Sequence, residues 1–315
     1  MKRTILLSVF TALCCSLVSA AGIKSKTYWT DSDVSYTATV KGNLVLMEGG
    51  TCHEGGFRFA LRANNDGSYT LVQHPEDVDG TDYTPVNAKP GDKILLRKVD
   101  KFECLVFYNA NGQPTDVLKR YDGDLEKEIR QTMYTDLEGR YNHPGGELYT
   151  FASDKCAFGT EAKLKPYTFI TQYDIPVNTF RTADGKLYTF LPSLQGIDLF
   201  KATVNPQDED DIEQGACVGQ LEKLISDVDN GRWPFTATEV VTTGRLGYYN
   251  KYLLRVMRNE IYARHGWHFD DPYLCEYFTN QWWYQDRNNN AGIKLSDLEL
   301  LNVALIKAME DKKQD

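Results

Sequence analysis

Alternating apolar and polar positions dominate the first third of the chain. Between residues 34 and 40 the apolar side chains occupy every second position, namely Val34, Tyr36, Ala38 and Val40. This alternation is typical of a half-buried β-strand, because successive side chains point to opposite faces. Two further apolar runs, 94–99 and 102–108, flank the short turn Asp100-Lys101. Short strands at this spacing predict a β-rich domain over residues 21–120, built as a small sandwich or barrel.

Residues 121–135 interrupt the strand pattern with a helical one. Leu125, Ile129 and Met133 are four positions apart among charged side chains, so they share one face of an amphipathic helix of about three turns. The strand pattern then resumes, and the hexapeptides that begin at Gly146 and Gly185 are near copies of each other. We interpret them as similar hairpin strands of a second small β module. The helix and this module together span residues 121–204.

The segment that follows is strongly acidic. Its carboxylates are crowded into six positions, as Asp208, Glu209, Asp210, Asp211 and Glu213. Like charges this close repel one another, which is typical of a solvated linker. A calcium loop is the alternative, but the run lacks the alternating spacing of such loops. We therefore predict an acidic linker, followed by a short helix from Val218 to Val228, over residues 205–231.

Helical spacing returns in the last part of the chain, residues 232–315. A first helix has its apolar positions four apart, at Leu253, Met257 and Ile261. Gly266 follows where a helix end often needs a left-handed residue, and Asp271-Pro272 is a typical start of a second helix. Ser296 and Glu299 form the sequence pattern of a capping box at the start of a third.

These patterns predict a multidomain α+β protein. N-terminal β-rich sandwich or small-barrel modules precede a small three-helix C-terminal domain. A length of 315 residues fits about two domains of ordinary size. Hydrophobic residues make up 42% of the chain and charged residues 25%, which is a globular composition and not a disordered one.

The first twenty residues have the organisation of a secretory signal peptide. Lys2 and Arg3 precede a short, mostly apolar run, and Val18-Ser19-Ala20 supplies the small residues of a cleavage site before Ala21. The run is too short to cross a membrane, and no later stretch is apolar enough to do so. We therefore expect an extracytoplasmic protein, either periplasmic or secreted.

Lipid attachment at Cys14 or Cys15 is the alternative fate of this segment. It is disfavoured because Leu13 or Cys14 would then stand where a small residue is normal. The net charge is −9 over the full chain, and it becomes −11 once Lys2 and Arg3 are removed. An acidic protein lacks the cationic field that nucleic acid and anionic membrane surfaces require, so neither is expected as a partner.

The cysteine count is odd after the signal peptide. Five cysteines remain, Cys52, Cys104, Cys156, Cys217 and Cys275. An oxidising compartment permits disulfides, and at least one thiol must stay outside any internal pairing. Cys52–Cys104 is the first pairing we would expect, because both residues lie in the same β-rich region; buried free thiols are the alternative. No C-x-x-C motif occurs, and we predict neither a metal nor a cofactor.

The helical region carries a specific motif. Residues 257–266 end in Tyr-Ala-Arg-His-Gly, and Phe269, Asp271-Pro272 and Tyr277-Phe278 follow it. This segment resembles the YARHG domain family over roughly residues 232–310. The resemblance implies an extracytoplasmic bacterial module found beside varied partner domains, with no general enzymatic activity. One departure from the family pattern is Gly244-Arg245, where an acidic helix start is usual. Residues 22–231 resemble no family in particular.

The candidate binding residues lie in and after this motif. They are Tyr262, Arg264, His265, Trp282, Trp283 and Tyr284. In one interpretation these aromatic and polar groups bind a ligand. In the other, Tyr262, Arg264 and His265 join Glu260 in a polar lock between the first helix and the aromatic segment. His265 and His268 with Asp270 could also be read as a metal cluster, but no third ligand has a standard offset.

No catalytic motif accompanies these residues, and we predict no catalytic residue. The sequence contains no G-x-S-x-G, no H-E-x-x-H and no S-x-x-K. The leading hypothesis is a non-enzymatic envelope protein that binds a cell-surface polymer, such as peptidoglycan or another glycan, or a partner protein. The alternatives are a secreted hydrolase or its accessory subunit, and a periplasmic carrier whose barrel holds a small apolar ligand.

Overall fold

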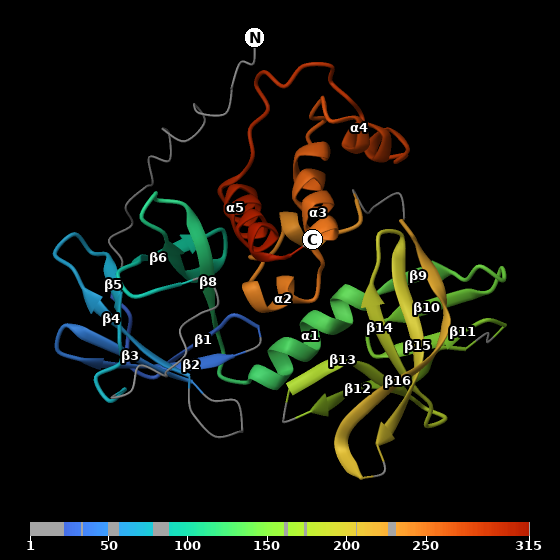
Figure 1. The fold of residues 1–315 in the computed structure, drawn as a ribbon, viewed down its shortest axis with the longest axis horizontal. Coiled ribbons are helices and arrows are strands. Elements are labelled where there is room, and N and C mark those ends of the chain that lie inside the picture. The colour runs from blue at the N-terminus through green and yellow to red at the C-terminus, as the bar shows by residue number, and fades with distance from the viewer. Residues whose placement is uncertain are drawn as a thin grey trace.

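The protein consists of two β-barrels and a C-terminal group of helices (Figure 1). This computed structural model describes residues 22–32, 34–49, 57–77, 88–160, 163–172, 175–205, 207–225 and 231–314. The predicted signal peptide and Cys52 lie outside these ranges. In the described part of the chain, no helix is both long and apolar enough to cross a membrane.

The first barrel is an antiparallel sheet in which each strand pairs with the next and β1 pairs with β8. The alternation at residues 34–40 is confirmed as a strand, with Tyr36 and Ala38 buried in the barrel core. The strands are β1 (Thr27–Thr30), β2 (Ser35–Lys41), β3 (Leu44–Gly49), β4 (Arg58–Ala63), β5 (Tyr69–Val72), β6 (Lys93–Val99), β7 (Phe102–Tyr108) and β8 (Pro114–Tyr121).

The predicted amphipathic helix is confirmed as α1 (Leu125–Leu137). It begins at Asp124, whose carboxylate accepts a hydrogen bond from the backbone of Lys127 (2.9 Å). Such a cap satisfies one of the free N–H groups in the first turn. The buried side chains of Ile129 and Met133 pack against the core of the second barrel. In Figure 1, α1 lies between the two barrels.

The second barrel is also closed, and β9 pairs with β16. The two near-copy hexapeptides form β10 and β14 of this one barrel, as predicted, and each places a tyrosine and a phenylalanine in the core. The strands are β9 (Gly139–Asn142), β10 (Leu148–Ala152), β11 (Lys155–Phe158), β12 (Lys165–Gln172), β13 (Ile175–Thr182), β14 (Leu187–Pro192), β15 (Gly196–Asn205) and β16 (Asp208–Leu224).

Aromatic rings fill the centre of the second barrel. The ring of Phe180 lies 5.2 Å from that of Tyr167, 5.6 Å from Phe151 and 5.6 Å from Tyr188, measured between centroids. An eight-stranded barrel has an interior that side chains alone can fill. This packing disfavours the hypothesis of a carrier with a ligand inside the barrel.

The prediction of a helix from Val218 to Val228 is wrong. The acidic run and the first part of the predicted helix form one long strand. Residues 208–224 form β16, which pairs with β15 along its length. A strand points neighbouring carboxylates to opposite faces, and Glu213 lies opposite the uncharged Thr203. Pairing with β15 therefore decides the conformation of this segment. Residues 226–230 lie outside the described ranges.

The three predicted helices of the C-terminal region are confirmed. They are α3 (Lys251–Ala263), α4 (Pro272–Thr279) and α5 (Asp297–Lys312), and two short elements precede them, η1 (Pro234–Ala237) and α2 (Thr243–Gly247). Asp271 caps α4, and both hydrogen bonds of the capping box at Ser296 and Glu299 are present. These local signals therefore set the helix boundaries.

Helix α5 covers the outer face of the first barrel. Leu298, Leu301 and Leu305 of α5 pack against Val99, Cys104, Val106 and Val117 of β6 to β8. Strand β7 is therefore buried on both faces, and burial raises the pKa of the Cys104 thiol to about 12. Its predicted pairing with Cys52 stays a prediction.

Replacing Leu305 tests this interface. Leu305→Ala should lower the free energy of unfolding by about 2–5 kcal/mol, because it leaves a cavity between α5 and the barrel. Leu300→Ala, on a half-buried position of the same helix, should cost about 1 kcal/mol or less. Urea denaturation followed by circular dichroism measures both. Equal losses would contradict the interface.

Candidate functional site

The motif arginine at the end of α3 is buried and hydrogen-bonded within the domain. Arg264 donates to the Thr236 hydroxyl (2.9 Å), to the Trp233 carbonyl (2.6 Å) and to the Glu260 carboxylate (2.5 Å). Its side chain is only 8% exposed. The predicted pairing of Arg264 with Glu260, one helical turn earlier, is therefore present.

Glu260 also binds the segment just before η1, through the backbone of that segment. Its carboxylate accepts hydrogen bonds from the backbone N–H groups of Arg232 and Trp233, both at 2.8 Å. Gly231 makes this approach possible, since its φ is +116° and an added Cβ would lie 2.5 Å from the Glu260 carboxylate. We call Glu260, Arg264 and the 231–236 segment the motif lock.

The motif histidine connects α3 to α5. His265 Nε2 lies 2.8 Å from Glu299 Oε1. The other carboxylate oxygen of Glu299 accepts from the Ser296 backbone and hydroxyl in the capping box (both 2.8 Å). Burial raises the pKa of Glu299, but the hydrogen bonds from His265 and Ser296 outweigh it and hold the pKa below its ordinary value.

The remaining motif residues shape the turn after α3. Gly266 has a φ of +77°, and a Cβ there would lie 2.5 Å from the Gln285 carbonyl. The Tyr262 ring packs on that of Trp267, with centroids 5.1 Å apart. Tyr284 donates its hydroxyl to the Trp267 carbonyl (2.7 Å), so the turn is joined to the aromatic segment.

The two adjacent tryptophans have different environments. Trp283 is half-buried against the domain core beside Phe278. Trp282 is 55% exposed and is one of the most exposed large apolar side chains of the described residues. Of the six predicted binding residues, Arg264 and His265 are therefore held by other parts of the domain, while Trp282 faces solvent.

His265, His268 and Asp270, the disfavoured metal-cluster alternative, do not come together in the described residues. His268 Nδ1 bonds to Asp286 (2.8 Å), and this carboxylate raises the pKa of His268. Asp270 lies 3.8 Å from the other ring nitrogen, whereas His265 pairs with Glu299. No group of three potential ligands gathers around a common point in the part of the chain that the structure describes.

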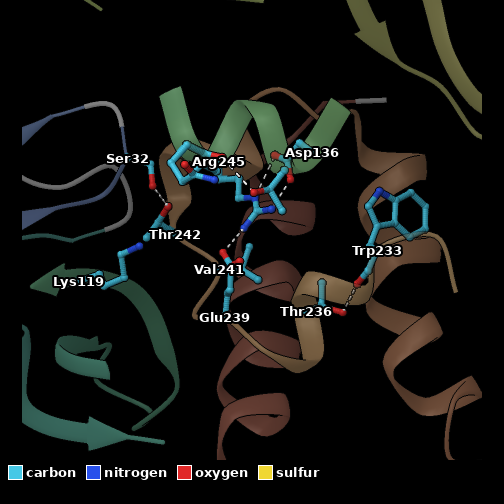
Figure 2. Close-up of polar contacts among 12 residues, drawn as sticks. Ser32, Lys119, Asp136, Trp233, Thr236, Glu239, Val241, Thr242 and Arg245 are labelled. Carbon is cyan, nitrogen blue, oxygen red and sulfur yellow. Dashed lines mark hydrogen bonds and ion pairs between the residues drawn. The ribbon is translucent and has the colours of Figure 1, made fainter. Parts of the chain in front are cut away.

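Sequence analysis missed the main role of Arg245, the departure from the family pattern. Figure 2 shows its guanidinium between Asp136 of α1 and Glu239. Nε donates to Asp136 (3.1 Å), Nη2 makes a second bond to the same carboxylate, and Nη1 donates to Glu239 (2.9 Å). Burial lowers the pKa of Arg245, but the two carboxylates more than offset it and raise the value.

Helix α2 also connects to the first barrel. The hydroxyls of Thr242 and Ser32 share a hydrogen bond of 2.6 Å (Figure 2). Thr243 donates to the buried carboxylate of Asp116 (2.8 Å), and the Gly244 N–H donates to the Asp31 carbonyl (3.0 Å). This one short helix therefore contacts the first barrel on one side and, through Arg245, the helix α1 on the other.

A cleft of about 210 Å³ lies beside this junction. The second barrel, α1 and the segment 231–239 form its walls. The charged residues of its lining are Asp136, Lys223, Arg232 and Glu239. Its aromatic lining residues are Tyr141, Phe190, Trp233, Phe235 and Tyr249. The cleft brings together residues that are far apart in the sequence, and no local motif indicated it.

The Arg245 ion pairs should be important for stability. Arg245→Met leaves Asp136 and Glu239 without a cation and should lower the free energy of unfolding by about 3 kcal/mol, near the low end for broken buried pairs because both acids are partly exposed. Adding Asp136→Asn should recover part of this loss. Arg120→Met removes an exposed pair with Glu103 and should cost at most about 1 kcal/mol. Equal costs at Arg245 and Arg120 would contradict this role.

The lowered pKa of Glu299 makes its contribution depend on pH. A carboxylate with a lowered pKa in the folded state stabilises the protein above its ordinary pKa of 4.5, and the effect is lost as the pH falls through the folded value. The difference in unfolding free energy between the parent and Glu299→Gln should therefore be larger at pH 7 than at pH 3. Glu276→Gln, on an exposed position of α4, controls for the loss of one carboxylate. A difference that does not change with pH would contradict the assignment.

Comparison with known protein families supports the motif assignment. No curated protein matches the chain, and no solved structure matches it either. The resemblance noted from the Tyr-Ala-Arg-His-Gly motif is confirmed, since residues 232–311 match the YARHG domain.

Proposed function

We propose that this is a non-enzymatic protein of the cell envelope, located outside the cytoplasm, that binds a cell-wall glycan through its YARHG domain. The observation that carries the proposal is the contrast within the motif region. The polar groups of Arg264 and His265 are held by internal hydrogen bonds, whereas neighbouring aromatic rings remain on the surface.

Three tyrosines of α3 and α4 add to the partly exposed aromatic rings of this domain. The rings of Tyr252 and Tyr273 are 5.4 Å apart, and those of Tyr273 and Tyr277 are 6.4 Å apart. Tyr252 of α3 is exposed, and the other two rings, on α4, are half-buried. Aromatic rings with one face in solvent are suited to stacking on sugar rings, and their rigidity lowers the entropic cost of binding.

Two further features support this location and class. The first twenty residues have the pattern of a signal peptide, and the YARHG resemblance implies an extracytoplasmic module. A hydrolase would favour a deep cleft with converging histidines and carboxylates. Among the described residues, the lining of the 210 Å³ cleft contains no histidine, and its two carboxylates both bond to Arg245.

Binding to purified peptidoglycan sacculi tests the proposal. The mature protein should co-sediment with sacculi in a saturable way. The double variant Trp282→Ala, Tyr252→Ala should bind at least about tenfold more weakly, as expected for aromatic hot spots, and should keep its fold because both side chains are exposed.

Tyr28→Ala is the matched control, because it removes an exposed tyrosine from the first barrel. It should bind sacculi like the parent. If the folded parent does not bind, the glycan proposal is overturned and a protein partner becomes the better hypothesis. If the double variant binds sacculi as tightly as the parent, Trp282 and Tyr252 are not part of the binding site.

Export of the chain provides a separate test. Expression in a bacterial host should give a product that lacks residues 1–20 and begins at Ala21, outside the cytoplasm. N-terminal sequencing and cell fractionation measure this. An intact N-terminus on a cytoplasmic product would overturn the location, and a lipidated cysteine would indicate the anchoring alternative.

A further inference from the structure

Arg232 is held in the cleft with few of its donors used. Its guanidinium donates one hydrogen bond to another described residue, from Nη2 to the Gly196 carbonyl of β15 (2.5 Å). Its Nε is buried and has no hydrogen-bond partner within the described ranges. The guanidinium also lies 5.4 Å from the Trp233 ring centroid.

The charge of Arg232 also lacks a carboxylate at ion-pair distance among the described residues. Burial lowers the pKa of Arg232, and nearby tyrosines and the Glu260 carboxylate offset only part of this effect. A buried cation without a counter-charge is costly, because the protein replaces its water shell incompletely. Most buried arginines offset this cost with a carboxylate, as Arg245 does a short distance away.

The two described acids that line the same cleft share one arginine, Arg245, which lies outside the lining. Asp136 and Glu239 both bond to Arg245. Lys223 of β16 contributes a second cation to the lining and lies 5.9 Å from the Tyr141 ring centroid. Among the described residues, the cations Arg232, Lys223 and Arg245 therefore exceed these two carboxylates by one charge, and neither acid bonds to Arg232.

We propose that this cleft is a subsite for a sugar that carries a carboxylate, and that Arg232 binds the carboxylate. The planar guanidinium can donate two parallel hydrogen bonds to such a group. This inference rests on the proposed glycan-binding function and names the class of sugar unit. At about 210 Å³, the cleft is smaller than the ~300–1,000 Å³ of typical drug-sized pockets and suits a single sugar.

The backbone of Arg232 is fixed by the motif lock, which favours a preformed binding site. Its N–H donates to Glu260 (2.8 Å), so the motif lock fixes the chain next to the cleft. Gly196 is equally constrained, because a Cβ there would lie 1.6 Å from the Leu221 carbonyl. The guanidinium is therefore held in place before any ligand arrives, which lowers the entropic cost of binding.

The test compares three probes on the full mature protein. N-acetylmuramic acid carries the sugar and the carboxylate, N-acetylglucosamine carries the sugar alone, and acetate carries the carboxylate alone. The indole N–H signals of Trp233 and Trp282, observed by NMR, report on the cleft and on the exposed aromatic surface respectively. N-acetylmuramic acid should shift the Trp233 signal and bind about ten- to hundredfold more tightly than the other two probes.

Substitution of Arg232 locates the effect. Arg232→Gln should reduce the affinity for N-acetylmuramic acid to that for N-acetylglucosamine. Arg232→Lys keeps the charge without the fork and should give an intermediate affinity. Arg120→Gln, an exposed arginine of the first barrel, should bind like the parent. If Arg232→Gln does not fold, the Trp233 signal of the parent and the Arg232→Lys affinity decide the question.

Several outcomes would overturn the subsite. The subsite is excluded if N-acetylmuramic acid binds no more tightly than N-acetylglucosamine or than acetate. It is also excluded if the preference for N-acetylmuramic acid remains in Arg232→Gln. A shift at Trp282 without one at Trp233 would place binding on the aromatic surface instead. If sacculi bind while N-acetylmuramic acid does not, the subsite fails and the proposed function stands. If N-acetylmuramic acid binds in the cleft and sacculi do not, polymer binding fails.

Discussion

The burial of one arginine is the constraint on which the arrangement of this protein depends. Arg245 is 5% exposed and holds two carboxylates from separate segments, with the Phe235 ring centroid 3.5 Å away. A guanidinium in that position must keep both partners within bonding distance, because an uncompensated buried charge is strongly unfavourable. Asp136 of α1 connects this arginine to the second barrel, on which α1 packs. The contacts of α2 connect it to the first barrel. The Arg245 side chain thus joins α2 to α1 and to Glu239, while its neighbours Thr242, Thr243 and Gly244 join α2 to the first barrel.

Local signals predicted the helices well, and non-local contacts explain the failures. Caps and four-residue spacing are encoded within a few positions, so α1, α3, α4 and α5 were predicted. Strand β16 was missed because its conformation depends on β15, and an acidic run in isolation resembles a linker. Arg245 was visible only as a departure from a family pattern. Its partner Asp136 is 109 residues away, and nothing near either residue indicates the pair.

The candidate site was predicted in part. The Glu260–Arg264 pair could be predicted from its spacing in the sequence. The segment that it binds could not, because the pair holds residues 231–236 and not the aromatic segment. The two adjacent tryptophans were both candidate binding residues, but Trp282 is exposed while Trp283 packs against the domain core. The motif residues thus hold neighbouring segments in place, and the Glu260 carboxylate fixes the backbone of Arg232.

The contact between α5 and the first barrel has a consequence for the synthesis of the chain. The apolar outer face formed by Cys104, Val106 and Val117 is covered by side chains that follow it by roughly 200 residues. Until the ribosome has made α5, that face is exposed and can associate with other chains. A chain that ended before α5 would keep this exposed face permanently. Chains that contain α5 should therefore resist aggregation and proteolysis better than chains that end before it.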